Sequence, residues 1–373
     1  MHRSHIFHKY ILPGLIFQSI TIAGGYGTGR ELVEFFLRYG PLGGLLALVL
    51  ATIIWSVVCA ITFELARLTR SFDYRTFSRQ LLGPAWGLYE LCYLAMMALI
   101  LAVIAAAAGS ILDEIFGLPY YVGVVGVVGT VGFFVFKGTT TIERFLSIWS
   151  FVLYANYIVF FVWCLGRFGG DIGSGLTTGG VLPGWFIGGV KYGANNIGVV
   201  PAILFCVRHL ETRREALVAG VLAGPLAMLP GLFFFLAMVG QYPQIVQETV
   251  PSIYLLDILG SRVFRIVFQV VLLGTLIETA TGMIHAVNER IGETMHERGA
   301  VMPSYVRPAV AVVLLALTTF LARFGLIDLI ASGYGTIAWG FLFLFVFPVL
   351  TFGTYQVITR PVAKTPAPDA GVA

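Results

Sequence analysis

The chain has 373 residues, of which 58% are hydrophobic and only 11% are charged, with a mean hydropathy of +0.89. This composition leaves too little polar surface for a water-soluble globular protein, so we expect an integral membrane protein surrounded by a lipid bilayer. The net charge of +4 says little about partners until the charges are placed on loops, and no nucleic-acid partner is expected.

Apolar runs of about 20 residues, the length that crosses the hydrocarbon core of a bilayer, recur along the chain. They do not alternate as the strands of a membrane barrel would, so the predicted fold class is all-α. The predicted spans, ten in number, lie at about 10–37, 41–66, 86–112, 119–136, 145–166, 184–208, 214–239, 262–289, 307–323 and 328–358.

Most of the 23 basic residues fall on alternate loops, for example Arg67, Arg70, Arg75 and Arg79 after the second span. Cytoplasmic loops are enriched in Lys and Arg. The pattern therefore predicts a multi-pass membrane protein with both termini in the cytoplasm.

Two connections have an amphipathic character. "SFDYRTFSRQLLG" follows the second span, and "QYPQIVQETVPSIYLLDILG" follows the seventh, where it could fold back over the outer mouth. Both end in Leu-Gly.

A shift of 170 residues places "GYGTGRELVEFFLRYG" (25–40) on "NNIGVVPAILFCVRHL" (195–210). This match predicts two halves of inverted topology, at about 10–167 and 184–358, within one membrane domain of residues 1–360. The Pro/Ala-rich tail 361–373 is expected to be a disordered cytoplasmic segment.

Corresponding spans of the two halves carry helix-breaking segments, at 24–29 in the first half and in "YGANNIGVVP" (192–201) in the second. Paired interruptions of this kind point to a binding site near the middle of the membrane, where freed backbone groups and dipoles meet a ligand. The predicted solute-binding residues are Gly25, Tyr26, Gly27, Thr28 and Gly29 on one side, and Tyr192, Asn195 and Asn196 on the other. Ordinary close packing through the Gly25/Gly29 pair is the alternative.

Charges inside a membrane are costly, so each one within a span calls for a role. Arg30 and Glu31 follow the first break and are predicted to form a gate, with Asp328 as a candidate partner of Arg30. Arg30 and Glu34 are also spaced to pair with each other, so a self-neutralising cluster is an alternative. Lys191, before the second break, either faces the solute or extends to the surface.

The eighth span carries a polar stripe in "LLGTLIETATGMIHAVNER". Glu278, Thr279 and Thr281 offer the hard oxygen ligands that Na⁺ or a coupled proton requires, with Thr279 the better placed of the two threonines. A purely structural hydrogen bond from Glu278 is the alternative. Asn156, Tyr93 and the segment 332–336 are candidate neighbours of the site.

The sequence contains no catalytic constellation, no nucleotide-binding glycine loop on a strand and no cofactor motif, so we do not expect an enzyme. Its broken first and sixth helices resemble the LeuT-type fold of the amino acid, polyamine and organocation transporter superfamily. Within it, "GGYGTGRELVEFF", "YGANNIGVVPAILF" and "RHLETRREAL" are similar to the YkvI family of bacterial membrane proteins.

The resemblance implies secondary active transport by alternating access, with the solute held between the unwound parts of helices 1 and 6. It also implies a coupling ion between the helix 1 break near Ala23 and Thr279, although Glu278 beside a single well-placed threonine leaves Na⁺ and H⁺ both open. The expected solute is an amino acid. A transporter-like sensor or assembly subunit without transport is the alternative, and a channel is disfavoured because only one span shows a polar stripe.

Overall fold

The computed structural model describes residues 6–21, 24–137, 139–178, 180–297, 303 and 305–359, and no strand occurs among them. The helical elements of the first part, with η marking 3-10 or π segments, are η1 (Phe7–Ile11), α2 (Leu12–Thr21), α3 (Gly24–Thr28), α4 (Arg30–Phe35), η2 (Leu37–Tyr39), α5 (Pro41–Thr69), α6 (Tyr74–Leu82), η3 (Gly83–Ala85), α7 (Trp86–Phe116), α8 (Tyr120–Lys137) and α9 (Thr139–Thr178).

The second part begins with α10 (Trp185–Ile197), η4 (Val200–Val207), α11 (Arg213–Val239), η5 (Gln244–Gln247), α12 (Pro251–Leu259), α13 (Arg262–Glu297) and α14 (Val306–Ala322). It ends with α15 (Gly325–Asp328), η6 (Leu329–Tyr334), α16 (Gly335–Phe341), η7 (Leu342–Val346), η8 (Val349–Gly353) and α17 (Thr354–Thr359).

Helix occurs in every range that the sequence predicts as a span, although α9 runs well beyond the expected 145–166 at both ends. Among the described residues, 5 helices are long and apolar enough to cross a membrane, or 6 if the bent pair of α10 and η4 counts as one. Two shorter apolar stretches, 120–135 and 306–322, accompany them.

Small residues bring the backbones of the central helices together. A Cβ atom on Gly220 of α11 would lie 2.3 Å from Ala60 Cα on α5, and one on Gly224 would lie 2.3 Å from Ser56 Oγ. On α10, a Cβ on Gly189 would meet the α5 backbone in the same way, at 2.7 Å. Because lipid tails give little hydrophobic drive for helix association, close packing of this kind is what holds α5, α10 and α11 together.

The first helix is interrupted, but not across the whole of 24–29 as the sequence predicts. Gly24–Thr28 form one helical turn, α3, and the change of direction in the described part falls on Gly29, whose φ of +83° ends that turn. Only glycine adopts this left-handed conformation without strain, so the turn persists up to the residue that can end it.

The second interruption is also shorter than predicted. Residues up to Ile197 remain α-helical, and the axis bends by 55° between α10 and η4. Pro201 lies in the first turn of η4, where its missing N–H costs no hydrogen bond.

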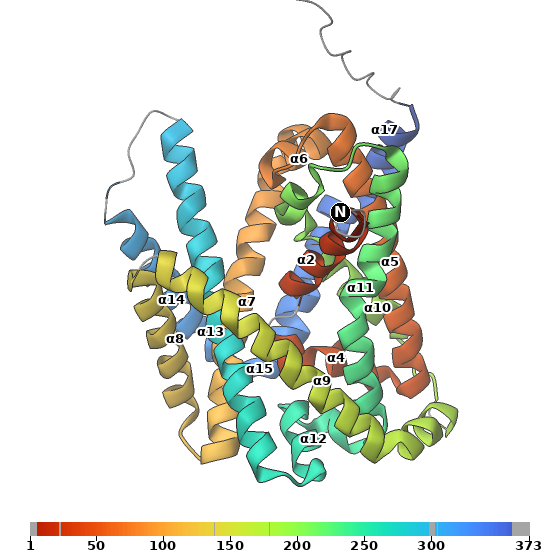
Figure 1. Ribbon diagram of the computed structural model, residues 1–373, viewed down its shortest axis with the longest axis vertical. Coiled ribbons are helices and arrows are strands. Elements are labelled where there is room, and N and C mark those ends of the chain that lie inside the picture. The colour runs from red at the N-terminus through yellow and green to blue at the C-terminus, as the bar shows by residue number, and fades with distance from the viewer. Residues whose placement is uncertain are drawn as a thin grey trace, which may run out of the picture.

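The two amphipathic connections form helices of 9 residues each, α6 and α12. Each ends at a glycine with positive φ, +54° at Gly83 and +74° at Gly260. Figure 1 shows α6 and α12 at opposite ends of the bundle, with α17 at the α6 end. We call these the α6 end and the α12 end.

Candidate functional site

Glu31 lies on α4, which packs against α10 where the two broken helices meet. The residue is only 2% exposed. Asn196 Nδ2 on α10 reaches Glu31 Oε1 over a long 3.5 Å, and it also donates to the Tyr192 carbonyl at 3.3 Å. Glu31 forms no ion pair with any residue that the structure describes. A carboxyl group is therefore buried with a single weak donor.

Three buried tyrosines, Tyr26 from α3, Tyr192 from α10 and Tyr334 from η6, lie within electrostatic reach of Glu31. They are at most 2% exposed, and none of their hydroxyls has a hydrogen-bond partner in the described part of the protein. We call Glu31, Asn196 and these three tyrosines the Glu31 cluster. Buried polar groups are normally satisfied, so this concentration of unpartnered atoms is unusual.

Asn195 adds a further unsatisfied group from the same helix. It is fully buried, and both its amide atoms lack a partner within the described ranges. The structure thus buries the predicted solute-binding residues of the second interruption, Tyr192, Asn195 and Asn196, on one segment of α10. Of these, Tyr192 and Asn196 lie near Glu31.

Tyrosine hydroxyls from other helices bind backbone carbonyls at the interruptions. Tyr157 of α9 donates to the carbonyl of Gly27 at 3.3 Å, and Tyr89 of α7 donates to the carbonyl of Gly198 at 2.8 Å. Sequence reasoning named the neighbours Asn156 and Tyr93 instead. The available signal was one of two tyrosines on each of these apolar helices, which does not reveal its partner.

The glycines of the first interruption serve packing in this conformation. A Cβ on Gly27 would lie 2.6 Å from Leu272 Cδ1 of α13, and one on Gly29 would lie 2.9 Å from the Phe234 ring of α11. Thr28 is fully buried, and its Oγ1 accepts a hydrogen bond from the Arg30 N–H at 3.4 Å. The space that we expected a ligand to fill beside Gly27 therefore holds Leu272, whereas Gly25 is described only in its backbone.

Arg30 turns away from Glu31 and binds the segment before α12. Its guanidinium donates to the carbonyls of Val246 and Glu248, each at 3.0 Å, and pairs with Glu34 at 3.2 Å. The predicted pairing of Arg30 with Glu34 is thus present, and Arg38 also bonds Glu34. The segment from "QYPQIVQETV" therefore closes over the α12 end.

The suggested pairing of Arg30 with Asp328 does not occur in this conformation. Asp328 is exposed and has no ion pair among the described residues. The two terminal nitrogens of Arg30 point instead to Glu34 and to two carbonyls.

On α13, Glu278 and Thr279 are partly buried, whereas Thr281 is only 1% exposed and its hydroxyl lacks a partner in the described part of the chain. Thr279 lies seven residues after Leu272, the residue that contacts Gly27, so the two share a helix face. Ala23, the other half of the expected ion site, lies outside the described residues.

Lys191 is half-buried, and its ammonium lies 5.7 Å from the centre of the Trp339 ring on α16. A cation over an indole face is a favourable arrangement. This contact places Lys191 against α16.

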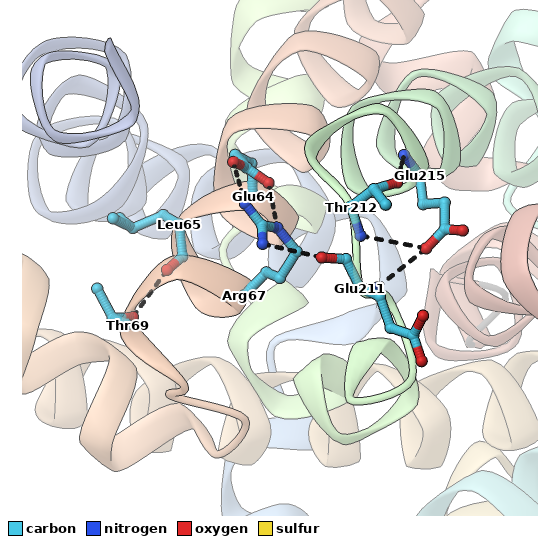
Figure 2. Close-up of polar contacts among 7 residues, drawn as sticks. All are labelled: Glu64, Leu65, Arg67, Thr69, Glu211, Thr212 and Glu215. Atoms are coloured by element: carbon cyan, nitrogen blue, oxygen red, sulfur yellow. Dashed lines mark hydrogen bonds and ion pairs between the residues drawn. The ribbon is translucent and has the colours of Figure 1, made fainter. Parts of the chain in front are cut away.

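A second polar group, at the α6 end, joins α5 to the start of α11 (Figure 2). Arg67 binds the Glu64 carboxylate through two nitrogens, at 2.7 and 2.8 Å, and donates to the Glu211 carbonyl at 3.0 Å. Thr212 and Glu215 form a capping box at the start of α11. The loop before α11 is therefore fixed to α5.

The same loop holds the beginning of the first helix. Lys9 pairs with Glu215 at 2.7 Å, and a ring nitrogen of His209 lies 2.8 Å from the His8 carbonyl. Polar contacts therefore join the chain at both the α6 end and the α12 end.

Comparison with known proteins places this geometry in context. No protein-family model matches the chain. An uncharacterised membrane protein of Bacillus subtilis, YkvI, is 20% identical over 294 residues, covering 74% of this chain and 79% of that protein.

Among solved structures, a Na⁺-coupled sialic acid symporter in a substrate-bound, outward-open state aligns over 91% of this chain and 84% of its own, with 11% identity and a TM-score of 0.51. Two structures of the Eremococcus coleocola manganese transporter align with 16% and 13% identity and TM-scores of 0.46 and 0.48; they cover 92% and 96% of this chain and 86% and 89% of their own. None of these names describes an enzyme, in agreement with the lack of a catalytic motif. The chain is a multi-pass helical membrane protein with the LeuT-type fold, and its sequence is similar to that of YkvI.

Proposed function

We propose that this protein is a secondary active transporter that moves a small solute across the membrane by alternating access. The observation that carries the proposal is the Glu31 cluster, a group of buried polar side chains with unmet hydrogen-bonding capacity between two interrupted helices. Unpartnered polar atoms of this kind are costly unless a ligand or water satisfies them. The LeuT-type fold supports the same proposal, because interrupted helices in transporters mark the solute site.

The solute is proposed to lie between the interrupted helices. Residues Gly25–Gly29 would offer backbone groups, and Tyr192, Asn195 and Asn196 would offer polar side chains. An amino acid suits these groups, since its carboxylate can accept from N–H groups at a helix start and its ammonium can bind carbonyls. Leu272 would have to move from Gly27 to admit it, which a change between conformations can provide.

The two halves proposed from the sequence, 10–167 and 184–358, find support in the matching α6 and α12 helices. Both have 9 residues, both follow the second span of their half, and both end at a Leu-Gly with positive φ. Their positions at opposite ends of the bundle are what an inverted repeat requires. We propose that the α6 end, which carries Arg67, Arg70, Arg75 and Arg79, faces the cytoplasm of a bacterial inner membrane.

Two sets of contacts would act as gates. Arg30 holds the segment before α12 at one end, and Lys9 holds the start of the first helix to α11 at the other. Alternating access requires one set to open while the other remains closed. With both formed, the structure corresponds to an occluded conformation.

Uptake of radiolabelled amino acids into proteoliposomes tests the proposal, with a Na⁺ gradient in one series and a proton gradient in another. Tyr192→Phe removes one unpartnered buried hydroxyl and should raise the KM for the transported amino acid. Tyr121→Phe, which removes a hydroxyl from a side chain that is 57% exposed, is the matched control and should leave uptake unchanged. Flat uptake of every amino acid under both gradients would argue against the proposal.

A further inference from the structure

The Glu31 carboxyl group is buried where a negative charge would have no ion-pair partner in the described part of the chain. Its residue is 2% exposed, and no ion pair reaches it among the described residues. Burying an ionised carboxylate without a partner costs far more free energy than burying a neutral carboxylic acid. A buried carboxyl group of this kind therefore loses its net charge. In the closed conformation Glu31 must therefore hold a proton or have a bound cation beside it.

The orientation of Asn196 favours a proton over a cation. Its Nδ2 atom lies 3.3 Å from the Tyr192 carbonyl, which can only accept a hydrogen bond, so the atom there is the nitrogen and not the amide oxygen. The same Nδ2 faces Glu31 Oε1. A metal ion on the Oε1 side of this carboxyl group would meet N–H hydrogens where it needs an oxygen, whereas a protonated Glu31 still accepts this hydrogen bond.

The other charged and titratable groups around α4 are engaged elsewhere or neutral. On α4 itself, Arg30 and Glu34 pair with each other. Between residues 216 and 239, α11 contributes no ionisable side chain. The neighbours on the remaining elements are Tyr26 on α3, Tyr192 and Lys191 on α10, Arg38 and Tyr39 on η2, and Tyr334 on η6.

We propose that Glu31 carries the coupling proton of transport. One proton from the bulk forms an O–H bond on the Glu31 carboxyl group while the cluster is open to one side. That bond breaks when the cluster opens to the other side, and the proton leaves with the solute. The hydroxyls of Tyr26, Tyr192 and Tyr334 provide a polar lining through which the proton reaches Glu31. This proposal assigns the coupling proton to Glu31 on α4, whereas the sequence suggested Glu278 on α13.

This proposal rests on the proposed function, so its test has one part that needs no solute. Infrared difference spectra of the reconstituted full-length protein are recorded between acid and alkaline pH, and the carbonyl stretch of a protonated carboxylic acid is followed. The other Asp and Glu residues give the same carbonyl background in both proteins, so the wild type should show one component of this band that Glu31→Gln lacks. Glu64→Gln is the matched control, since Glu64 is equally buried but paired with Arg67, and it should keep the band.

A Glu31→Gln spectrum identical to that of the wild type, with no component lost, overturns the proposal. Conversion of the band to a carboxylate by added Na⁺ at constant pH also overturns it, because Glu31 would then be a sodium ligand. If Glu31→Gln does not fold, Glu31→Asp keeps a titratable group and should shift the band without removing it.

The second part measures uptake into proteoliposomes at equal Na⁺ on both sides. Accumulation by the wild type should rise with an inward proton gradient, whereas Glu31→Gln should show none of that dependence. Gradient dependence that survives in Glu31→Gln contradicts the proposal. Absent uptake of all solutes by the wild type would instead refute the proposed function, while the infrared bands would still decide the state of Glu31.

Discussion

The Glu64–Arg67 pair predicts a stability effect that depends on which partner is removed. Glu64 is 1% exposed, and its carboxylate receives two N–H bonds from Arg67, whose side chain is 11% exposed. Arg67→Met would leave this carboxylate buried without its cation and would also free the Glu211 carbonyl. Removing one partner of a buried pair costs about 3–5 kcal/mol, and the partial exposure of Arg67 places the expected loss at about 3 kcal/mol.

The double variant Glu64→Gln/Arg67→Met should recover much of that loss, because it leaves a neutral amide in place of a buried charge. Unfolding of the purified protein in mixed micelles with increasing denaturing detergent gives the free energies of Arg67→Met, Glu64→Gln and the double variant. Arg70→Met is the control. Arg70 is exposed and makes no ion pair in the described part of the chain. The methionine would replace another non-glycine residue at the same positive φ. A double variant as unstable as the sum of the single variants would refute the reasoning.

Two further predictions concern packing and closure. Gly220→Ala places a Cβ 2.3 Å from Ala60 Cα and should destabilise the protein by roughly 1–3 kcal/mol or more in the same unfolding assay, whereas Gly126→Ala, with no atom within 4 Å, should not. Arg30→Met removes two hydrogen bonds to the Val246–Glu248 segment. It should speed amide exchange there about thirtyfold, equivalent to about 2 kcal/mol of local stability, while the exposed Arg262→Met leaves it unchanged; equal exchange in both would contradict the closing role of Arg30.

Hydropathy and turn chemistry are local properties, and they predicted the helical ranges well. They also marked the two connections as amphipathic with Leu-Gly ends, and these connections contain α6 and α12. The i, i+4 spacing likewise predicted the Arg30–Glu34 pair.

Which side chains line the site depends on how each helix is rotated about its axis and how it packs on its neighbours. No short sequence pattern encodes either. Adjacent residues on a helix point about 100° apart, so Arg30 and Glu31, treated together as a gate, face different neighbours. The exact ends of each interruption, and the presence of Leu272 beside Gly27, are set by helices far away in the sequence.

The tyrosine hydroxyls on the Gly27 and Gly198 carbonyls have a consequence for how tightly any solute can be held. Both carbonyls already have donors from Tyr157 and Tyr89 in the closed protein. An incoming ammonium group would have to displace a hydroxyl of comparable hydrogen-bonding capacity, so only the difference between the two bonds would contribute to affinity. Internal competition of this kind favours modest affinity and rapid release, which suits a carrier whose rate depends on letting its cargo go.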